Sequence, residues 1–428
     1  MIKNKALVDV GVYYTSTAIN QAVPFLILPI ITIYLNPRDF GFINTFSAIL
    51  LISTSVFNGL YVTINKHFYL KSDDYNQLLI GNLYLILVLG TVIITVIASI
   101  LVIVGNLEVM PMPYLLLIPL ISFFYVNLEV LKTVFKISKK TVAFAILTFS
   151  DVFVNVTLTL VLVIGLSWHW QGRVVAIISS TVLMGLFALI FMITKDKVRF
   201  SFDFEVVKDI LNVAIPLIPS GFSVMLMRRS GVLFIDSSLG KVEAGLYGVA
   251  MNLATIILFL SVPLINVWTP YLYEKLSQYA GKSVLALLYH KLWLLGIGTC
   301  IMGLLFSLFS QPILKLMTTK AFHQAGKFIP WLAFGFCLWA MTALLTPFLV
   351  HFNRQKWIAL IASGGAVVNL GLNHYLIGRY GSIGAAISFF AANFLCALIM
   401  FATVRHVGKL SFLPSFRLLL QEAKGVFK

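Results

Sequence analysis

Long apolar stretches alternate along the chain with short groups of charged residues, Pro and Gly. A helix needs about 20 apolar residues to cross a bilayer core. Twelve stretches reach this length, at residues 7–35, 41–65, 78–105, 112–135, 141–166, 172–194, 210–235, 243–272, 285–309, 328–351, 356–378 and 381–404. The pattern therefore predicts an all-α polytopic membrane protein with twelve transmembrane helices.

The longest charged connector separates these spans into two sets of six. We expect an N-terminal six-helix lobe over 1–194, a cytoplasmic linker over 195–209, a C-terminal six-helix lobe over 210–404 and a cytoplasmic tail over 405–428. The tail mixes apolar and basic residues, which favours a short helix lying on the inner leaflet.

Two short phrases recur about half a chain apart. Leu-x-x-x-acid-x-Gly-apolar begins at Leu35 and again at Leu239, an offset of 204, and Gly-x-x-x-Ala-x-x-Ser begins at Gly172 and again at Gly381, an offset of 209. Such duplication is the usual plan of secondary transporters. Because each half has an even number of spans, both insert the same way up, which predicts pseudo-two-fold symmetry and a cavity between two bundles.

Composition and charge agree with this interpretation. The chain is 60% hydrophobic and 11% charged, whereas soluble proteins are about a quarter charged. Of 31 Lys and Arg residues, 22 fall at the termini or in and beside connectors after even-numbered spans, 7 fall in and beside connectors after odd-numbered spans, and two lie well inside span seven. Positive residues stay cytoplasmic, so we expect both termini inside. Contact with anionic lipid then explains the net charge of +16, and no nucleic-acid partner is required.

The sequence carries no catalytic signature. It has no nucleotide-binding P-loop, and its Cys and His residues lack metal-ligand spacing, so we assign no catalytic residue, metal or cofactor. A membrane glycosyltransferase or polymerase is the enzymatic alternative. Such an enzyme usually has a large periplasmic loop, and every periplasmic connector expected here is short.

Five stretches, in order along the chain, carry a family resemblance. They are residues 24–29 (Pro-Phe-Leu-Ile-Leu-Pro), 35–41, 216–219 (Pro-Leu-Ile-Pro), 245–247 and 369–386. With them the chain resembles the polysaccharide transporter branch of the multidrug/oligosaccharidyl-lipid/polysaccharide (MOP) exporter superfamily, and more specifically bacterial Wzx-type O-antigen flippases.

The resemblance implies a two-lobed, MATE-like protein of the bacterial inner membrane. It would move an undecaprenyl-diphosphate-linked oligosaccharide, an O-antigen or capsule repeat unit, from the cytoplasmic to the periplasmic leaflet by alternating access. We expect a monomer, with an O-antigen polymerase and a chain-length regulator as candidate partners. A multidrug/cation antiporter of the same superfamily is the alternative. Relatives often carry Asp-Arg in span seven where this chain has Gly231 and Val232, so that pair's role is not carried over.

Arg228 and Arg229, inside span seven, are the first candidates for substrate binding. A charge at the centre of a span costs about 2.5–3.5 kcal/mol on insertion scales. Guanidinium groups bind diphosphate oxygens in bidentate geometry, so binding a diphosphate would explain why the charges are kept there. The alternatives are extension to the periplasmic interface and pairing with Asp236.

Three cationic residues near the cytoplasmic side are further candidates for phosphate contact. Lys66 and His67 end span two, and Lys132 lies on span four, one turn after Glu129. Anchoring at the cytoplasmic surface is the alternative for all three.

Other polar residues lie inside predicted spans. Asn369 and Asn373 on span eleven are candidates for binding sugar hydroxyls, with helix packing as the alternative. Asp151 on span five is a candidate for proton or sodium coupling, and pairing with a neighbouring helix is the alternative.

Prolines interrupt the first span of each half. Pro24 and Pro29 lie in span one, and Pro216 and Pro219 lie in span seven. Each proline removes a backbone hydrogen bond and bends a helix. Their equivalent placement predicts hinges.

Overall fold

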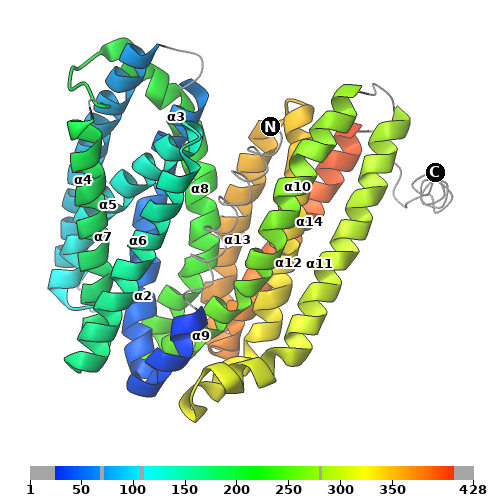
Figure 1. Ribbon diagram of the computed structural model, residues 1–428. Coiled ribbons are helices and arrows are strands. Elements are labelled where there is room, and N and C mark those ends of the chain that lie inside the picture. Colours follow the sequence, from blue (N-terminus) through cyan, green and yellow to red (C-terminus); the bar gives the residue numbers. More distant parts are fainter. Residues whose placement is uncertain (1–24, 68–71, 106–109, 196, 279–281, 409–428) are drawn as a thin grey trace. The chain divides into compact units, whose positions relative to one another are not determined.

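The computed structural model describes residues 25–67, 72–105, 110–195, 197–278 and 282–408. These residues form helices joined by short connectors, and no strand occurs among them (Figure 1).

The helices of the first half are Phe25–Tyr34, α2 (Pro37–Ser55), α3 (Asn58–His67), α4 (Asp73–Gly105), α5 (Met112–Ile137), α6 (Thr141–Thr159), the π-helical turn η1 (Leu160–Gly165) and α7 (His169–Thr194). The second half contains α8 (Phe204–Leu239), α9 (Lys241–Ala254), α10 (Ile256–Gln278), α11 (Lys282–Met317), the 3₁₀ turn η2 (Lys320–Lys327), α12 (Ile329–His351), α13 (Gln355–Tyr380) and α14 (Ile383–Gly408). Ten helical stretches are long and apolar enough to cross a membrane, and the bent pair α2–α3 makes an eleventh. Phe25–Tyr34 is a shorter apolar helix that falls within the first expected span, and residues 7–24 of that span lie outside the described residues.

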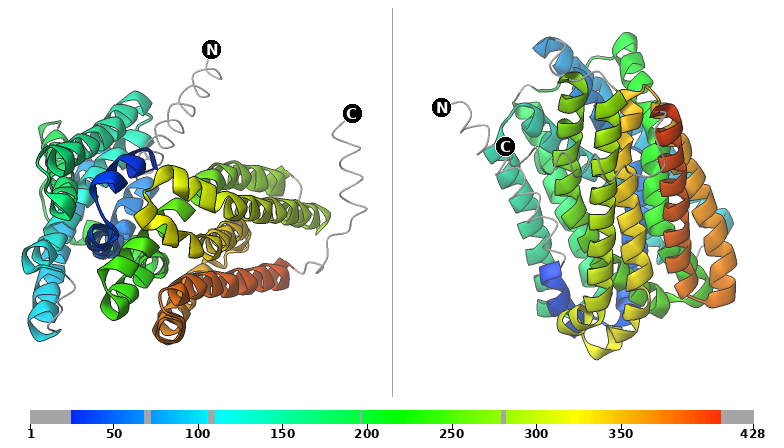
Figure 2. Two further views of the ribbon diagram at one scale, coloured as in Figure 1. Left: turned by 90° about the horizontal axis from the view of Figure 1, so that it is seen from below. Right: turned by 90° about the vertical axis from the view of Figure 1, so that its right-hand side faces the viewer.

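The described helices fall into two compact units. Unit 1 contains the chain up to Gly248 together with Met317–Phe322, and unit 2 contains Val249–Leu316 and the chain from His323. In unit 1, α8 packs along α2, α3 and α4; in unit 2, α12 packs on α10 and α14, and α13 packs on α14 (Figure 2). The boundary between the units, at Gly248, lies later in the chain than the linker expected at residues 195–209. Because these units are defined by contacts and the expected lobes by sequence repeats, the lobe boundaries stay a prediction.

Helix α4 buries apolar residues inside the protein on one face and exposes other apolar residues on its surface. Leu79, Leu83 and Leu87 recur every four residues and are fully buried in the core of unit 1. Further along, Leu89 and Ile93 are more than half exposed. An apolar surface of this kind is stable only against lipid, which agrees with a membrane-spanning helix.

The charged connector before α8 is docked on α4. The Arg199 amide donates to the Gln77 carbonyl (3.0 Å), and the Asn82 side chain donates to the Ser201 carbonyl (2.9 Å). Asp203 then caps α8, because its Oδ1 accepts from the Glu205 amide at 2.9 Å. This cap starts α8 at Phe204, six residues before the expected start of span seven at 210.

Both copies of the Leu-x-x-x-acid-x-Gly phrase form a helix start. In the first copy, Asn36 and Asp39 form a capping box: the Asp39 amide donates to Asn36 Oδ1 (3.0 Å), and the Asn36 amide donates to Asp39 Oδ2 (3.1 Å). In the second copy, Gly240 ends α8 with φ +85°, a conformation that favours glycine, and α9 begins at the next residue.

The two copies of this phrase pack against each other inside unit 1. A methyl group on Gly41 would overlap the Lys241 carbonyl, and one on Gly245 would overlap the Pro37 carbonyl. Adding the offset of 204 to Gly41 and Pro37 gives Gly245 and Lys241, so the two contacts are reciprocal. We call this contact the glycine crossing. It brings the start of α2 and the start of α9 so close that neither glycine has room for a Cβ atom.

Helices break where hydroxyl side chains bond to backbone carbonyls. The α2–α3 pair bends by 47° after Thr54 and Ser55, whose hydroxyls donate to the carbonyls of Leu51 and Ile52 at 3.0 and 2.6 Å. A second break, between α9 and α10, falls at Thr255. Hydroxyls that bind carbonyls in this way compete with the helix ladder and bend helices.

Candidate functional site

Arg228 and Arg229 lie deep in α8. Arg228 is 11 residues before Leu239, or about 16 Å at 1.5 Å per residue. Within the expected span 210–235 the pair lies past the middle, about 10 Å before the periplasmic end of that span, so extension of the side chains to the periplasmic interface stays an alternative. The Arg229 Nε is buried and has no hydrogen-bond partner among the described residues.

Asp236 is engaged elsewhere, so it does not neutralise the arginine pair. Its carboxylate forms an ion pair with Lys241 and accepts a hydrogen bond from the Thr45 hydroxyl at 3.0 Å. The alternative in which Arg228 and Arg229 pair with Asp236 is therefore not what the structure contains. The two arginines are adjacent like charges whose mutual repulsion an anionic ligand would relieve.

Lys132 is held between two carboxylates. Its Nζ lies 3.0 Å from Glu129 Oε1 on α5 and 3.0 Å from Asp151 Oδ2 on α6. Asp151 is therefore paired with a residue of a neighbouring helix, which was one of the two alternatives for it. Lys132 as a substrate contact and Asp151 as a coupling site stay predictions. We call Glu129, Lys132 and Asp151 the carboxylate–lysine triad.

The triad is one end of a polar stripe on α6. Asp151, Asn155 and Thr159 are spaced four residues apart and share one helix face. At the other end, Arg173 on α7 donates from Nη1 to Asn155 Oδ1 at 2.8 Å and to the Thr159 hydroxyl. Sequence analysis counted Arg173 among the seven cationic residues in and beside connectors after odd-numbered spans, and it missed this contact. Extending the Asp151–Asn155 spacing by one more turn would have drawn attention to it.

The two candidate amides lie inside unit 2. Asn369 and Asn373 on α13 are fully buried, and Asn373 Nδ2 donates to Asn369 Oδ1 at 3.2 Å. This arrangement fits helix packing. Sugar binding by these amides stays a prediction.

Three of the remaining candidates have side chains that the structure does not describe. Lys66 and His67 end α3, but their side chains lie outside the described part, and so does all of Pro24. Their phosphate and hinge roles stay predictions.

The other predicted hinges lie within continuous helices. Pro216 and Pro219 are inside α8, and Pro29 is inside the helix Phe25–Tyr34. Their hinge role also stays a prediction. The breaks that the structure does show, between α2 and α3 and between α9 and α10, occur in spans two and eight at hydroxyl residues that sequence analysis did not single out.

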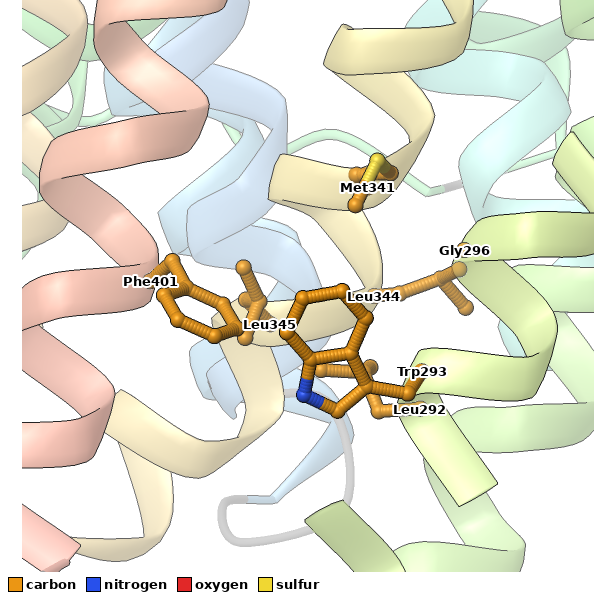
Figure 3. Close-up of a pocket in the computed structure, with 7 residues that line it drawn as sticks. All are labelled: Leu292, Trp293, Gly296, Met341, Leu344, Leu345 and Phe401. Atoms are coloured by element: carbon orange, nitrogen blue, oxygen red, sulfur yellow. The ribbon is translucent and has the colours of Figure 1, made fainter. Parts of the chain in front are cut away.

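Two cavities lie within single units. An apolar pocket in unit 2 is lined by Leu292, Trp293, Gly296, Met341, Leu344, Leu345 and Phe401 (Figure 3). Its volume of about 10 Å³ is no larger than one water molecule needs, so it is not a substrate site. An open apolar groove of about 720 Å³ in unit 1 lies between the helix Phe25–Tyr34 and α6, and Phe149, Phe153 and Leu160 are among its lining residues.

Taken together, the described helices form an all-helical polytopic membrane fold of the MATE type, with cationic side chains inside its expected spans. Three solved structures share this fold. An inward-facing multidrug resistance MATE family transporter of the MOP superfamily has a TM-score of 0.69 and 15% identity, covering 91% of this chain and 94% of that one. The lipid II flippase MurJ, in an inward closed conformation, has a TM-score of 0.65 and 12% identity, covering 97% and 91%. A mutant of the Vibrio cholerae MATE transporter VcmN has a TM-score of 0.51 and 14% identity, covering 93% of each chain.

The chain belongs to the polysaccharide biosynthesis protein family, whose model matches residues 6–275. No curated protein is significantly similar to it in sequence. The expected MOP-superfamily membership and the MATE-like, polytopic all-α fold are thereby confirmed.

Proposed function

We propose that this chain is a flippase that moves an undecaprenyl-diphosphate-linked oligosaccharide from the cytoplasmic to the periplasmic leaflet of the bacterial inner membrane. The observation that carries the proposal is the Arg228–Arg229 pair inside the apolar helix α8, with the nearby Asp236 engaged by Lys241. In a polysaccharide biosynthesis protein, the ligand that offsets such a charge is the diphosphate of a lipid-linked sugar.

The apolar groove beside α6 supports an amphipathic substrate. Its lining residues occupy one face of α6, whereas Asp151, Asn155 and Thr159 occupy another. A lipid-linked sugar has both an apolar tail and a polar head, which suits a helix with both kinds of face. A multidrug/cation antiporter is supported by likeness of fold alone, and two adjacent arginines inside a membrane-spanning helix disfavour a cationic substrate.

The remaining parts of the proposal concern assembly and energy. We place both termini in the cytoplasm, expect a monomer, and keep an O-antigen polymerase and a chain-length regulator as candidate partners. Transport proceeds by alternating access between the two lobes, coupled to protons or sodium through Asp151.

The test is lipid flipping in proteoliposomes. A fluorescent polyprenyl-diphosphate-linked sugar is reconstituted with the protein, and dithionite quenching reports how fast the label changes leaflet. We expect Arg228→Ala with Arg229→Ala to slow flipping at least about tenfold, because each charge-assisted hydrogen bond contributes about 1.5–3 kcal/mol.

Arg379→Ala is the matched control, since Arg379 is exposed and bonds to Tyr375 on its own helix. It should flip at the wild-type rate. Wild-type flipping by the double variant would refute the diphosphate contact. Transport of ethidium, but not of the lipid-linked sugar, by the wild type would favour the antiporter.

A further inference from the structure

The guanidinium of Arg173 is held rigidly from one side. Its Nη1 donates to Asn155 Oδ1 and to the Thr159 hydroxyl. Both acceptors are themselves fixed: Asn155 Nδ2 donates to the Ser180 hydroxyl (2.8 Å), and the Thr159 hydroxyl donates to the Asn155 carbonyl (2.6 Å). The orientation of the planar group is therefore set before any ligand arrives.

The opposite edge of the same guanidinium carries its unused donors. Within the described part of the chain, Nε and Nη2 of Arg173 make no hydrogen bond, and neither is sealed from its surroundings. These two nitrogens form one of the edges with which arginine grips a phosphate through two parallel hydrogen bonds. The structure thus fixes Nη1 and leaves a bidentate edge available.

The positive charge of Arg173 is not neutralised by a carboxylate of the described residues, because its partners Asn155 and Thr159 are neutral. It also lies five residues into α7, near the positive end of that helix dipole, where a cation is unfavourable. Tying α6 to α7 requires only a neutral donor. A positive charge at this place therefore points to an anionic ligand.

The position of Arg173 matches a path along unit 1. The α6 stripe runs from Asp151 to Thr159, about 12 Å at 1.5 Å per residue. Lys132 lies at its inner end and Arg173 at its outer end. On the predicted topology, the inner end is nearer the cytoplasm and the outer end nearer the periplasm.

We infer that Arg173 forms a second, periplasm-facing anion subsite that receives a phosphoryl group of the transported lipid. The inference rests on the proposed flippase function for the identity of the lipid. The chemistry recognised at the subsite is the diphosphate, whether it is free or attached to a lipid.

Binding to purified wild-type protein in detergent micelles tests the subsite without transport. Titrations with inorganic pyrophosphate and with geranylgeranyl diphosphate, followed by calorimetry, separate the free anion from the lipid headgroup. We expect Arg173→Ala to weaken binding of at least one probe about tenfold or more, the loss of one bidentate, charge-assisted contact. Arg173→Lys keeps the charge and loses the fork, so an intermediate loss is expected.

Two controls separate ligand binding from a structural tie. Thr159→Val removes one tie to Arg173 and keeps its charge, so it should weaken binding clearly less than Arg173→Ala does. Arg379→Ala should also bind as wild type. Wild-type affinity for both probes in Arg173→Ala, or no binding of either probe to the wild type, would overturn the inference.

The binding and flipping experiments can refute the subsite and the proposed function independently of each other. If Arg173→Ala loses diphosphate binding but the wild type flips no lipid-linked sugar, the subsite stands and the proposed function falls. If the wild type flips the lipid and Arg173→Ala binds both probes normally, the function stands and the subsite falls.

Discussion

At the scale of single residues, the charges of unit 1 are unevenly matched. The carboxylate–lysine triad places two carboxylates on one ammonium, a formal charge of −1, whereas Arg173 has only neutral partners. One added proton would neutralise the triad and weaken its hold on Lys132. That surplus negative charge is the physical reason to expect the coupling ion at Asp151.

Asp151→Asn should remove the response of flipping to an ion gradient. A gradient of one pH unit supplies about 1.4 kcal/mol per proton, so wild-type flipping should respond clearly to it if protons are the coupling ion. The measurement is the initial flip rate in proteoliposomes with an imposed pH or sodium gradient. Asp209→Asn is the control, because Asp209 is also hydrogen-bonded, to the Tyr75 hydroxyl at 2.7 Å, but lies near the start of α8. An unchanged gradient response in Asp151→Asn would exclude it as the coupling site.

At the scale of helices, the glycine crossing sets how closely α2 and α9 approach. The atoms facing Gly41 and Gly245 belong to backbone, and backbone in the first turn of a helix cannot move aside as a flexible side chain can. A methyl group added here must push whole helices apart.

We expect Gly41→Ala to destabilise the protein by about 1–3 kcal/mol, the usual cost of overpacking. Gly364→Ala is the matched control, because no atom lies within 4 Å of the added carbon. Since alanine favours helix more than glycine does, this change should be neutral or stabilising by up to about 1 kcal/mol. Thermal unfolding of both variants in detergent measures the difference. Equal unfolding temperatures would show that the crossing is looser than the structure has it.

Periodicity predicted the helices well because each must hide its backbone from lipid, whatever its neighbours are. Residues 112–135 and 328–351 were expected as spans, and α5 and α12 match them within two residues at each end. Contacts between helices could not be predicted in this way. Arg173 and Thr159 come together because the π-helical turn η1 and the connector 166–168 lead the chain from α6 back along it as α7, and no local sequence pattern reports that pairing.

At the scale of the whole molecule, the proposed alternating-access mechanism requires some contacts to open in every cycle. The glycine crossing joins the second span of each sequence half, so we expect it to open when the substrate leaves toward the periplasm. Asn44 and Gly248 sit at its edge: a Cβ on Gly248 would lie 2.8 Å from Asn44 Cβ. Disulfides need about 3.8 Å between these atoms, which a small outward shift supplies.

Asn44→Cys with Gly248→Cys should therefore form a disulfide that stops transport. The background lacks the native Cys300, Cys337 and Cys396. Under oxidation the flip rate should fall to that of protein-free vesicles, and a reductant should restore it. Asn44→Cys alone should flip normally under both conditions. Full flipping by a completely cross-linked protein would mean that the crossing stays closed throughout the cycle.

The reciprocity of the glycine crossing also bears on ancestry. Residues 37 and 41 contact residues 241 and 245 in a pattern that is unchanged when the two copies are exchanged. Two identical half-length polypeptides would make the same contact as a homodimer, in which each glycine mutation would count twice. Joining two such copies in one chain would remove that constraint. Asn44 facing Gly248, at the same offset of 204, is a place where the two copies differ.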